Sequence, residues 1–198
     1  MTLREEMQRY ALIHDVPVMQ EEGQLFLLRL IREQKVRSIL ELGTAIAYTT
    51  LAMASQDPQI HIDTVERDPQ MAALAEDYIR RSSHAAQITL YPMDIDDFVT
   101  EKKYDLILVD AAKAQYPVYF RRFQENLQEE GLFVFDDMVF HGMIERPEQP
   151  KNRSTRNLLR RIARFRREAA SESGFTCEFY DKIGDGILIM RRRKKDES

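Results

Sequence analysis

Carboxylates follow two apolar runs in the middle of the chain. The run 104–109 ends on Asp110, and the run 132–135 ends on Asp136 and Asp137. If both runs are neighbouring parallel strands, these carboxylates meet at one edge of a sheet, because parallel strands share a C-terminal edge. Such oxygen ligands suit Mg²⁺, Mn²⁺ or Ca²⁺, and no Cys or His cluster favours zinc. Aspartates at strand ends are also common turn formers, so a metal site and a simple turn are both open.

A lysine lies close to the first of these carboxylates in the sequence. Lys113 follows Asp110 in the stretch Asp-Ala-Ala-Lys. Its amine could bind an acidic group of a substrate, or act as a general base if its pKa were lowered. Most lysines are only solvated, so the residue type alone does not choose among these roles.

A second candidate site follows the apolar stretch 38–42, where Gly43 opens a turn before a helix. Glycine lets a ligand approach the backbone closely, and free amides at the start of the helix can donate to it. The turn lacks the glycine pattern of dinucleotide-binding proteins, because Ala45 and Ile46 occupy the positions of further glycines. Glu41 would repel phosphates and suit a cationic ligand. The pattern favours an adenosine carrying an amino acid and a sulfonium over NAD.

Two acidic residues end the next expected strands. Glu66 follows the stretch 60–65 and is placed to accept hydrogen bonds from both ribose hydroxyls of such a ligand. Asp94 lies just beyond the stretch 88–91 and could face the adenine edge. Either carboxylate could instead be solvated at the end of a strand.

Apolar periodicity divides the chain into alternating strands and helices. We expect strands over 38–42, 60–65, 88–91, 104–109, 132–135, 175–181 and 186–192. We expect helices over 3–13, 20–34, 45–55, 71–82, 96–100, 117–128 and 154–171, with a turn at Gly131. The alternation predicts an α/β fold with a mostly parallel sheet of seven strands and helices on both faces. The segment 182–186 has the composition of a hairpin turn, so the last two strands should be antiparallel.

Composition predicts one globular domain over 1–198, with an N-terminal helical cap at 1–34 and a frayed tail at 193–198. The apolar fraction of 43% and the charged fraction of 31% exclude a disordered chain. No stretch is long and apolar enough for a membrane helix, and the first residues do not resemble a signal peptide, so we expect a cytoplasmic protein. The single cysteine, Cys177, cannot form an internal disulfide, and we interpret it as a packed strand residue.

Positive charge is concentrated near the C-terminus although the net charge is -4. The basic residues of the segment 151–167 are Lys151, Arg153, Arg156, Arg160, Arg161, Arg164, Arg166 and Arg167. In a helix over 153–167 most arginines face outward, where they could meet phosphates, and the inward face consists of Leu158, Leu159, Ile162 and Phe165. The alternative is an ordinary solvated charged face.

These residues belong to segments that resemble a known family. The segments are 40–44 (Leu-Glu-Leu-Gly-Thr), 65–66 (Val-Glu), 105–113 (Asp-Leu-Ile-Leu-Val-Asp-Ala-Ala-Lys), 135–142 (Phe-Asp-Asp-Met-Val-Phe-His-Gly) and 182–186 (Lys-Ile-Gly-Asp-Gly). In order and length they resemble the cation-dependent O-methyltransferases of the catechol and caffeoyl-CoA type. More narrowly, the chain is similar to short bacterial members that methylate 5-hydroxyuridine at the tRNA wobble position, giving 5-methoxyuridine.

The resemblance implies a Rossmann-like methyltransferase fold that binds S-adenosylmethionine. Positions that contact this cofactor in the family match Met19, Thr49, Glu66, Asp94, Ile95 and Asp110. Asp110 would also bind the metal ion, with Asp136 and Asp137. The family usually has Asn at the last position, and the extra charge of Asp137 should strengthen binding of a divalent ion. Ala47 stands where relatives often have Gly, which affects the fit around the methionine moiety.

The implied reaction is methylation of a hydroxyl that has a neighbouring oxygen. The metal ion would coordinate both oxygens and lower the pKa of the hydroxyl, and Lys113 would help to take or stabilise the charge of the proton. The basic segment 151–167 favours tRNA as the partner, and relatives suggest a homodimer. No membrane attachment is expected. The alternative is a small catechol-like or hydroxylated metabolite. A non-catalytic cofactor-binding protein is disfavoured because every expected carboxylate is present.

Overall fold

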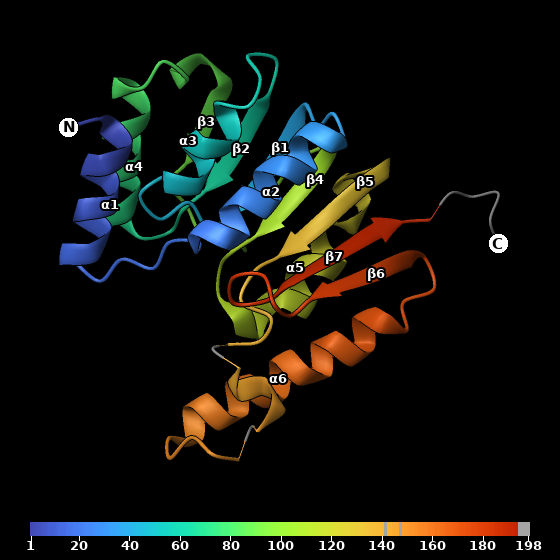
Figure 1. Ribbon diagram of the computed structural model, residues 1–198. Coiled ribbons are helices and arrows are strands. Elements are labelled where there is room, and N and C mark those ends of the chain that lie inside the picture. The colour runs from blue at the N-terminus through green and yellow to red at the C-terminus, as the bar shows by residue number, and fades with distance from the viewer. Residues whose placement is uncertain (141, 147, 194–198) are drawn as a thin grey trace.

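The fold is built on a single seven-stranded sheet, seen in a computed structural model that describes residues 1–140, 142–146 and 148–193 (Figure 1). The strands are β1 (Ser38–Leu42), β2 (His61–Val65), β3 (Ile88–Tyr91), β4 (Tyr104–Val109), β5 (Leu127–Phe135), β6 (Phe175–Tyr180) and β7 (Ile187–Arg192). The α-helices are α1 (Leu3–Ile13), α2 (Glu21–Glu33), α3 (Tyr48–Ala54), α4 (Pro69–Arg81), α5 (Tyr116–Phe123) and α6 (Arg153–Ala170). Short 3₁₀ turns are η1 (Ala85–Gln87), η2 (Lys113–Gln115), η3 (Gln124–Asn126) and η4 (Met143–Glu145).

The strand order is β3-β2-β1-β4-β5-β7-β6. All pairs from β3 to β5 are parallel, whereas β7 is antiparallel to both β5 and β6. The predicted mostly parallel sheet with an antiparallel C-terminal pair is confirmed. Because β1 to β5 are parallel, their C-terminal ends lie at one edge of the sheet, and the loops that follow them converge there.

Alternating residues of the central strands bury two separate cores. On one face, side chains such as Phe133 and Phe135 pack with α5 and α6, through Tyr116 and Phe165. On the other face, the intervening residues, such as Val134, pack with α2 and α3. In Figure 1, α2 crosses in front of the sheet and α5 lies behind it. Both faces are therefore covered, as the near-continuous apolar runs of β4 and β5 require.

Several predicted boundaries are wrong, for local reasons. α3 begins at Tyr48 and not at residue 45, because Ala45 and Ala47 take positive φ angles of 47° and 65° that no helix accommodates. The expected helix over 96–100 is a turn at 95–97 followed by chain without regular structure, and the Asp96 amide donates to the side chain of Asp94. α5 ends at Phe123 and continues only as the 3₁₀ turn η3.

β5 begins earlier than the sequence indicates. We expected a turn at Gly131 before a strand over 132–135, but Gly131 lies inside β5, where the pairing with β4 is irregular. A Cβ atom at Gly131 would lie 2.8 Å from the side chain of Leu127. Glycine marks a bulge-like irregularity here, where the backbone approaches a neighbouring side chain.

The N-terminal segment contributes to two layers. α2 packs on the sheet through Leu27 and Ile31, whereas α1 lies beside α3 and α4 (Figure 1). Among the described residues, no helix is long and apolar enough to cross a membrane. In the tail that we expected to fray, residues 194–198 lie outside the described residues.

Candidate active site

A cavity of about 630 Å³ opens at the C-terminal edge of the sheet. Sheet register explains its position: Leu42 pairs with Val65 and Val109, and Val109 pairs with Phe135, so the next residue of each strand lies in one row. All residues that the sequence nominated for the site line this cavity: Met19, Glu41, Gly43, Thr49, Glu66, Asp94, Ile95, Asp110, Lys113, Asp136 and Asp137. The structure thus brings the nominated residues together, while their individual roles stay predictions.

Gly43 lets the loop after β1 pack against the end of β4. Its φ angle is +101°, and a Cβ atom built on it would lie 2.2 Å from the carbonyl oxygen of Asp110. We expected glycine here to give a ligand access to the backbone. The nearest obstacle to a side chain is instead the backbone of Asp110, so Gly43 sets the distance between two loops of the site.

Glu41 is a buried residue of the cavity lining. Its side-chain Oε2 accepts hydrogen bonds from the hydroxyls of Thr50 (2.5 Å) and Thr64 (2.6 Å). Burial raises the pKa of Glu41 to about 8, against the lowering effect of both hydroxyls. The sequence indicated a fixed negative charge here. In the protein without ligand this carboxyl is mostly protonated at neutral pH, so a cationic group brought nearby would favour its ionisation.

Replacing Glu41 with glutamine is expected to flatten the dependence of stability on pH. The pKa of Glu41 is higher in the folded protein, about 8, than its model value of 4.5. Its protonated form therefore stabilises the fold at low pH, and this contribution is lost as pH rises through about 8. Thermal unfolding of ligand-free protein at about pH 6 and about pH 9 should show a smaller decrease for Glu41→Gln than for wild type. Equal decreases would contradict the assignment.

Glu66 is held by the backbone on both sides. Its Oε2 accepts from the amide of Ala45, and its Oε1 accepts from the amide of Asp68, both at 2.8 Å. Each carboxylate oxygen keeps a second lone pair, so the group can still accept two hydrogen bonds from a ligand. The amide of the left-handed Ala45 thus helps to fix the orientation of the Glu66 carboxylate, whose ribose contact stays a prediction.

Burial raises the pKa values of both Asp110 and Asp136, with Asp137 contributing to each and Asp110 contributing also to that of Asp136. Burial is the largest cause for both, and the neighbouring carboxylates add to it, giving values of about 6 for Asp110 and about 8 for Asp136. Asp136 is 4% exposed, and the hydroxyl of the fully buried Tyr116 donates to its backbone carbonyl at 3.0 Å. This site accumulates negative charge that a cation would stabilise.

Lys113 lies against Asp137 in an ion pair, with both side chains about a quarter exposed or less. The sequence did not indicate this contact. Asp137 has a φ angle of 56°, a left-handed conformation that Asn and Asp tolerate better than other side chains. Lys113 thereby offsets the additional charge of an aspartate at this position.

The three aspartates fit a hard divalent cation by their donor chemistry, since they offer only carboxylate oxygens. Their geometry is not that of a preformed metal cluster: among the described residues no group of three or more His, Cys, Asp or Glu side chains is arranged to hold a metal ion. Asp137 would have to share its carboxylate with Lys113 or leave it. The metal site stays a prediction.

Other cavity residues were not nominated from the sequence. They include Val16, Pro17 and Val18 from the segment between α1 and α2, and Arg67, Tyr119, Phe140 and Asp185. Asp185 is 5% exposed, and its carbonyl accepts from the amide of Val139 at 2.9 Å. Its segment was interpreted only as a hairpin turn and as part of a family motif, because the antiparallel insertion of β7 beside β5 is what brings it to the carboxylates.

Comparison with known proteins identifies the family. The family described as O-methyltransferase matches residues 1–193. The chain is a member of the O-methyltransferase family. Among its relatives is the flavonoid 3',5'-methyltransferase of Vitis vinifera, which is 26% identical over 94% of this chain and 82% of its own length. The catechol O-methyltransferase of Niastella koreensis is 31% identical over 60% of this chain and 57% of its own length.

Solved structures of O-methyltransferases share the fold closely. A structure of a proposed caffeoyl-CoA O-methyltransferase from Staphylococcus aureus has a TM-score of 0.92 and 27% identity, covering 98% of this chain and 93% of its own. An O-methyltransferase from Bacillus cereus, solved with S-adenosylhomocysteine (SAH), has a TM-score of 0.81 and 20% identity, covering 96% of this chain and 90% of its own. The predicted methyltransferase fold of the catechol and caffeoyl-CoA type is thereby confirmed, whereas none of these relatives is named for tRNA.

Proposed function

We propose that this O-methyltransferase transfers the methyl group of S-adenosylmethionine to one hydroxyl of a small catechol-like compound, with help from a divalent cation. The main support for this proposal is that carboxylates at the ends of neighbouring strands line one cavity. They are Glu66 after β2, Asp110 after β4, and Asp136 and Asp137 after β5. The relatives named for catechol and flavonoid substrates support the small-molecule assignment over the tRNA assignment.

The cofactor half of the cavity comprises the loops after β1, β2 and β3. Glu66 would accept from the ribose hydroxyls, and Asp94 and Ile95 would lie beside the adenine. The ammonium or sulfonium of the cofactor would lie over Glu41, whose buried carboxyl ionises more readily beside a cation. This cavity volume suits a ligand of that size together with a small acceptor.

The acceptor half comprises the loops after β4 and β5. A divalent ion held by Asp110, Asp136 and Asp137 would supply Lewis-acid polarisation of the acceptor hydroxyl. The chain's own residues orient the acceptor so that its oxygen lies in line with the methyl group. The new oxygen–methyl bond forms as the sulfur–methyl bond breaks, SAH is released, and the ammonium of Lys113 stabilises the oxyanion formed when the hydroxyl proton is lost to solvent.

The decisive experiment is incubation with radiolabelled S-adenosylmethionine, Mg²⁺ and a catechol, followed by separation of the methylated product. A labelled methyl ether supports the proposal. Phenol, with a single hydroxyl, is the matched control acceptor and should stay unlabelled, since it lacks the neighbouring oxygen. Equal labelling of phenol would contradict the proposed vicinal arrangement, and absence of label from both would contradict the small-molecule assignment.

A second candidate substrate, the wobble 5-hydroxyuridine of tRNA, is favoured by α6. Arg156 and Arg166 are engaged, the first with the backbone carbonyls of Pro150 and Lys151 and the second with Asp181. Four exposed arginines of α6 form no ion pair with any residue that the structure describes: Arg153, Arg160, Arg161 and Arg167. Figure 1 shows the start of α6 on the side of the sheet where β4 and β5 end. A polyanion bound there would be close to the cavity.

Replacing Arg160 and Arg161 with glutamine tests this candidate. If α6 binds tRNA phosphates, tRNA affinity should fall, and the slope of log affinity against log salt should decrease by about 1 to 2. The matched control is the pair Arg29→Gln and Arg32→Gln, which removes two exposed arginines from α2. Equal effects of both pairs, or no tRNA binding by wild type, would count against the tRNA substrate. The expected homodimer stays a separate prediction.

A further inference from the structure

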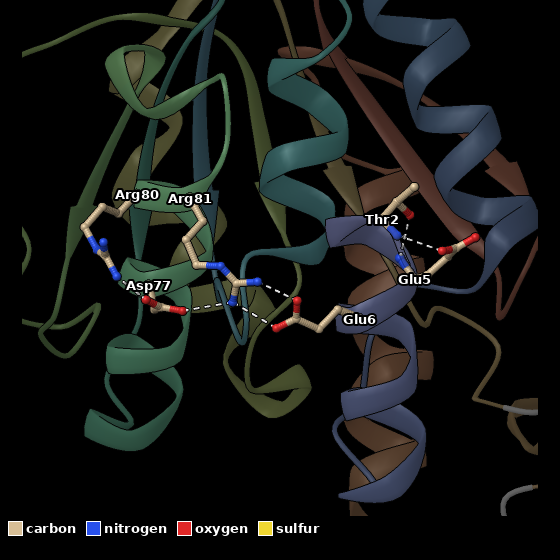
Figure 2. Close-up of polar contacts among 6 residues, drawn as sticks. All are labelled: Thr2, Glu5, Glu6, Asp77, Arg80 and Arg81. Carbon is tan, nitrogen blue, oxygen red and sulfur yellow. Dashed lines mark hydrogen bonds and ion pairs between the residues drawn. The ribbon is translucent and has the colours of Figure 1, made fainter.

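One arginine of α4 joins α1 to the body of the protein. The guanidinium of Arg81 donates to both carboxylate oxygens of Glu6, with NH1 to Oε1 at 2.8 Å and NH2 to Oε2 at 2.5 Å (Figure 2). NH1 also donates to Asp77, one turn earlier on α4, at 3.1 Å. We call these two parallel hydrogen bonds between Arg81 and Glu6 the fork. The fork fixes the orientation of the two side chains as well as their distance, because two nitrogens of one planar guanidinium are engaged. Asp77 thereby holds Arg81 in the direction of α1.

α1 in turn holds the segment that covers the cavity. The amide of Val16 donates to the carbonyl of Ala11 in the last turn of α1 at 3.0 Å. From there the chain passes over the cavity, which residues 16–20 line from above, and Met19 is 4% exposed. We call residues 14–20 the lid. Its far end is fixed by α2, which packs on the sheet, so its near end depends on the position of α1.

α1 is attached to the rest of the protein by one small apolar cluster and by a few polar contacts, one of which is a hydrogen bond from Arg4 to Gln24 of α2 at 2.8 Å. Its buried residues Met7 and Ala11 belong to a small cluster with Ile46, Tyr48 and Tyr78, separate from both cores of the sheet. Gln8 donates to the hydroxyl of Tyr48 at 2.7 Å, and Tyr48 lines the cavity. A small cluster and a few polar contacts make α1 a candidate for local opening with a lower free energy than unfolding of the sheet.

We propose that Arg81 is a positioning residue for cofactor retention: its fork to Glu6 keeps α1, and with it the lid, closed over the cavity. This inference rests on the proposed function, in which the cavity binds S-adenosylmethionine. Arg81 does not line the cavity, so it acts only through α1. Loss of the fork raises the fraction of molecules with an open lid and accelerates cofactor release, while the chemical step in the closed form is unchanged.

The neighbouring arginine provides a matched control. Arg80 pairs with Asp77 on the same helix but does not contact α1 (Figure 2). Arg81→Gln and Arg80→Gln therefore remove the same charge from adjacent positions, and only the first detaches α1. SAH, which cannot react, serves as the binding probe. We expect its dissociation rate in stopped-flow measurements to rise about three-fold in Arg81→Gln and to stay unchanged in Arg80→Gln.

Kinetics separates positioning from a loss of stability. In Arg81→Gln the KM for S-adenosylmethionine should rise by the same factor, with kcat at saturating cofactor unchanged, and Glu6→Gln should reproduce the effect. The double variant should have nearly the same SAH dissociation rate and KM as either single variant, because Glu6→Gln and Arg81→Gln break the same contact. Equal dissociation rates for Arg81→Gln, Arg80→Gln and wild type would overturn the inference, as would a decrease in kcat alone. Failure of wild type to bind SAH would instead overturn the proposed function.

Discussion

Alanine at position 43 is expected to destabilise the fold and to eliminate methyl transfer. The added Cβ would lie 2.2 Å from the carbonyl oxygen of Asp110, and alanine would have to keep a φ angle of +101°. Strain in the backbone and overpacking together should lower the free energy of unfolding by about 2 to 4 kcal/mol. Relief of the clash would move Asp110, the residue predicted to contact both cofactor and metal ion. Urea unfolding and initial rates measure the two effects.

Gly174 offers the matched control for this substitution. A Cβ atom there would meet nothing within 4 Å, and its φ angle is not in the left-handed range. The free energy of unfolding of Gly174→Ala should therefore lie within about 0.5 kcal/mol of the wild-type value, and the variant should retain activity. If Gly43→Ala were as stable and active as Gly174→Ala, the close packing of the β1 loop on β4 would not exist as described.

Removal of the Asp136 carboxylate is expected to reduce methyl transfer by about 100-fold or more without unfolding the protein. The backbone of Asp136 stays anchored, because Tyr116 donates to its carbonyl and not to its side chain. Asp136→Asn keeps the shape and removes the charge. Excess chelator should reduce wild-type activity to the level of the variant and should have little further effect on Asp136→Asn. Calorimetric titration with Mg²⁺ should show weaker binding by the variant.

Stability supplies an independent readout for the same residue. The pKa of Asp136 is about 8, raised first by burial and then by Asp110 and Asp137. Because this value lies above the model value of 3.8, the protonated carboxyl stabilises the metal-free fold at low pH, and stability is lost as pH rises through about 8. As pH rises through about 8, Asp136→Asn should therefore lose less stability than wild type.

The chelator experiment can contradict the predicted metal site. Full activity of wild type in excess chelator would show that the reaction needs no metal ion.

The sequence predicted what depends on strand ends. Glu66, Asp110, Asp136 and Asp137 could be placed at one edge because apolar runs mark parallel strands and each run ends on a carboxylate. That inference required only that the strands be parallel. Their C-terminal ends then lie at one edge of the sheet, whatever the exact pairing of residues between strands. The family resemblance supplied the roles of Met19, Thr49 and Ile95, for which no local pattern exists.

The rest depends on contacts between segments that are distant in sequence. Nothing about alanine indicates the left-handed Ala45 and Ala47, whose conformation is imposed by the loop that reaches Glu66. The pairing of Lys113 with Asp137 and the inclusion of Asp185 both require the strand order, which an alternating pattern leaves undetermined. The basic face of α6 was evident from charge spacing, and together with the resemblance it led to the prediction of tRNA as a partner, whereas the named relatives favour small molecules.

The placement of β7 has a consequence for biosynthesis. This strand is the last described element to leave the ribosome, yet it pairs with β5 on one side and β6 on the other. The segment after β5 is held in part by this late-arriving part of the chain, because the amides of Met138 and Val139 donate to the carbonyls of Gly186 and Asp185. A nascent chain that stops before residue 185 therefore exposes an unpaired edge of β5 and lacks an organised acceptor half. Activity should appear only once synthesis has passed this point.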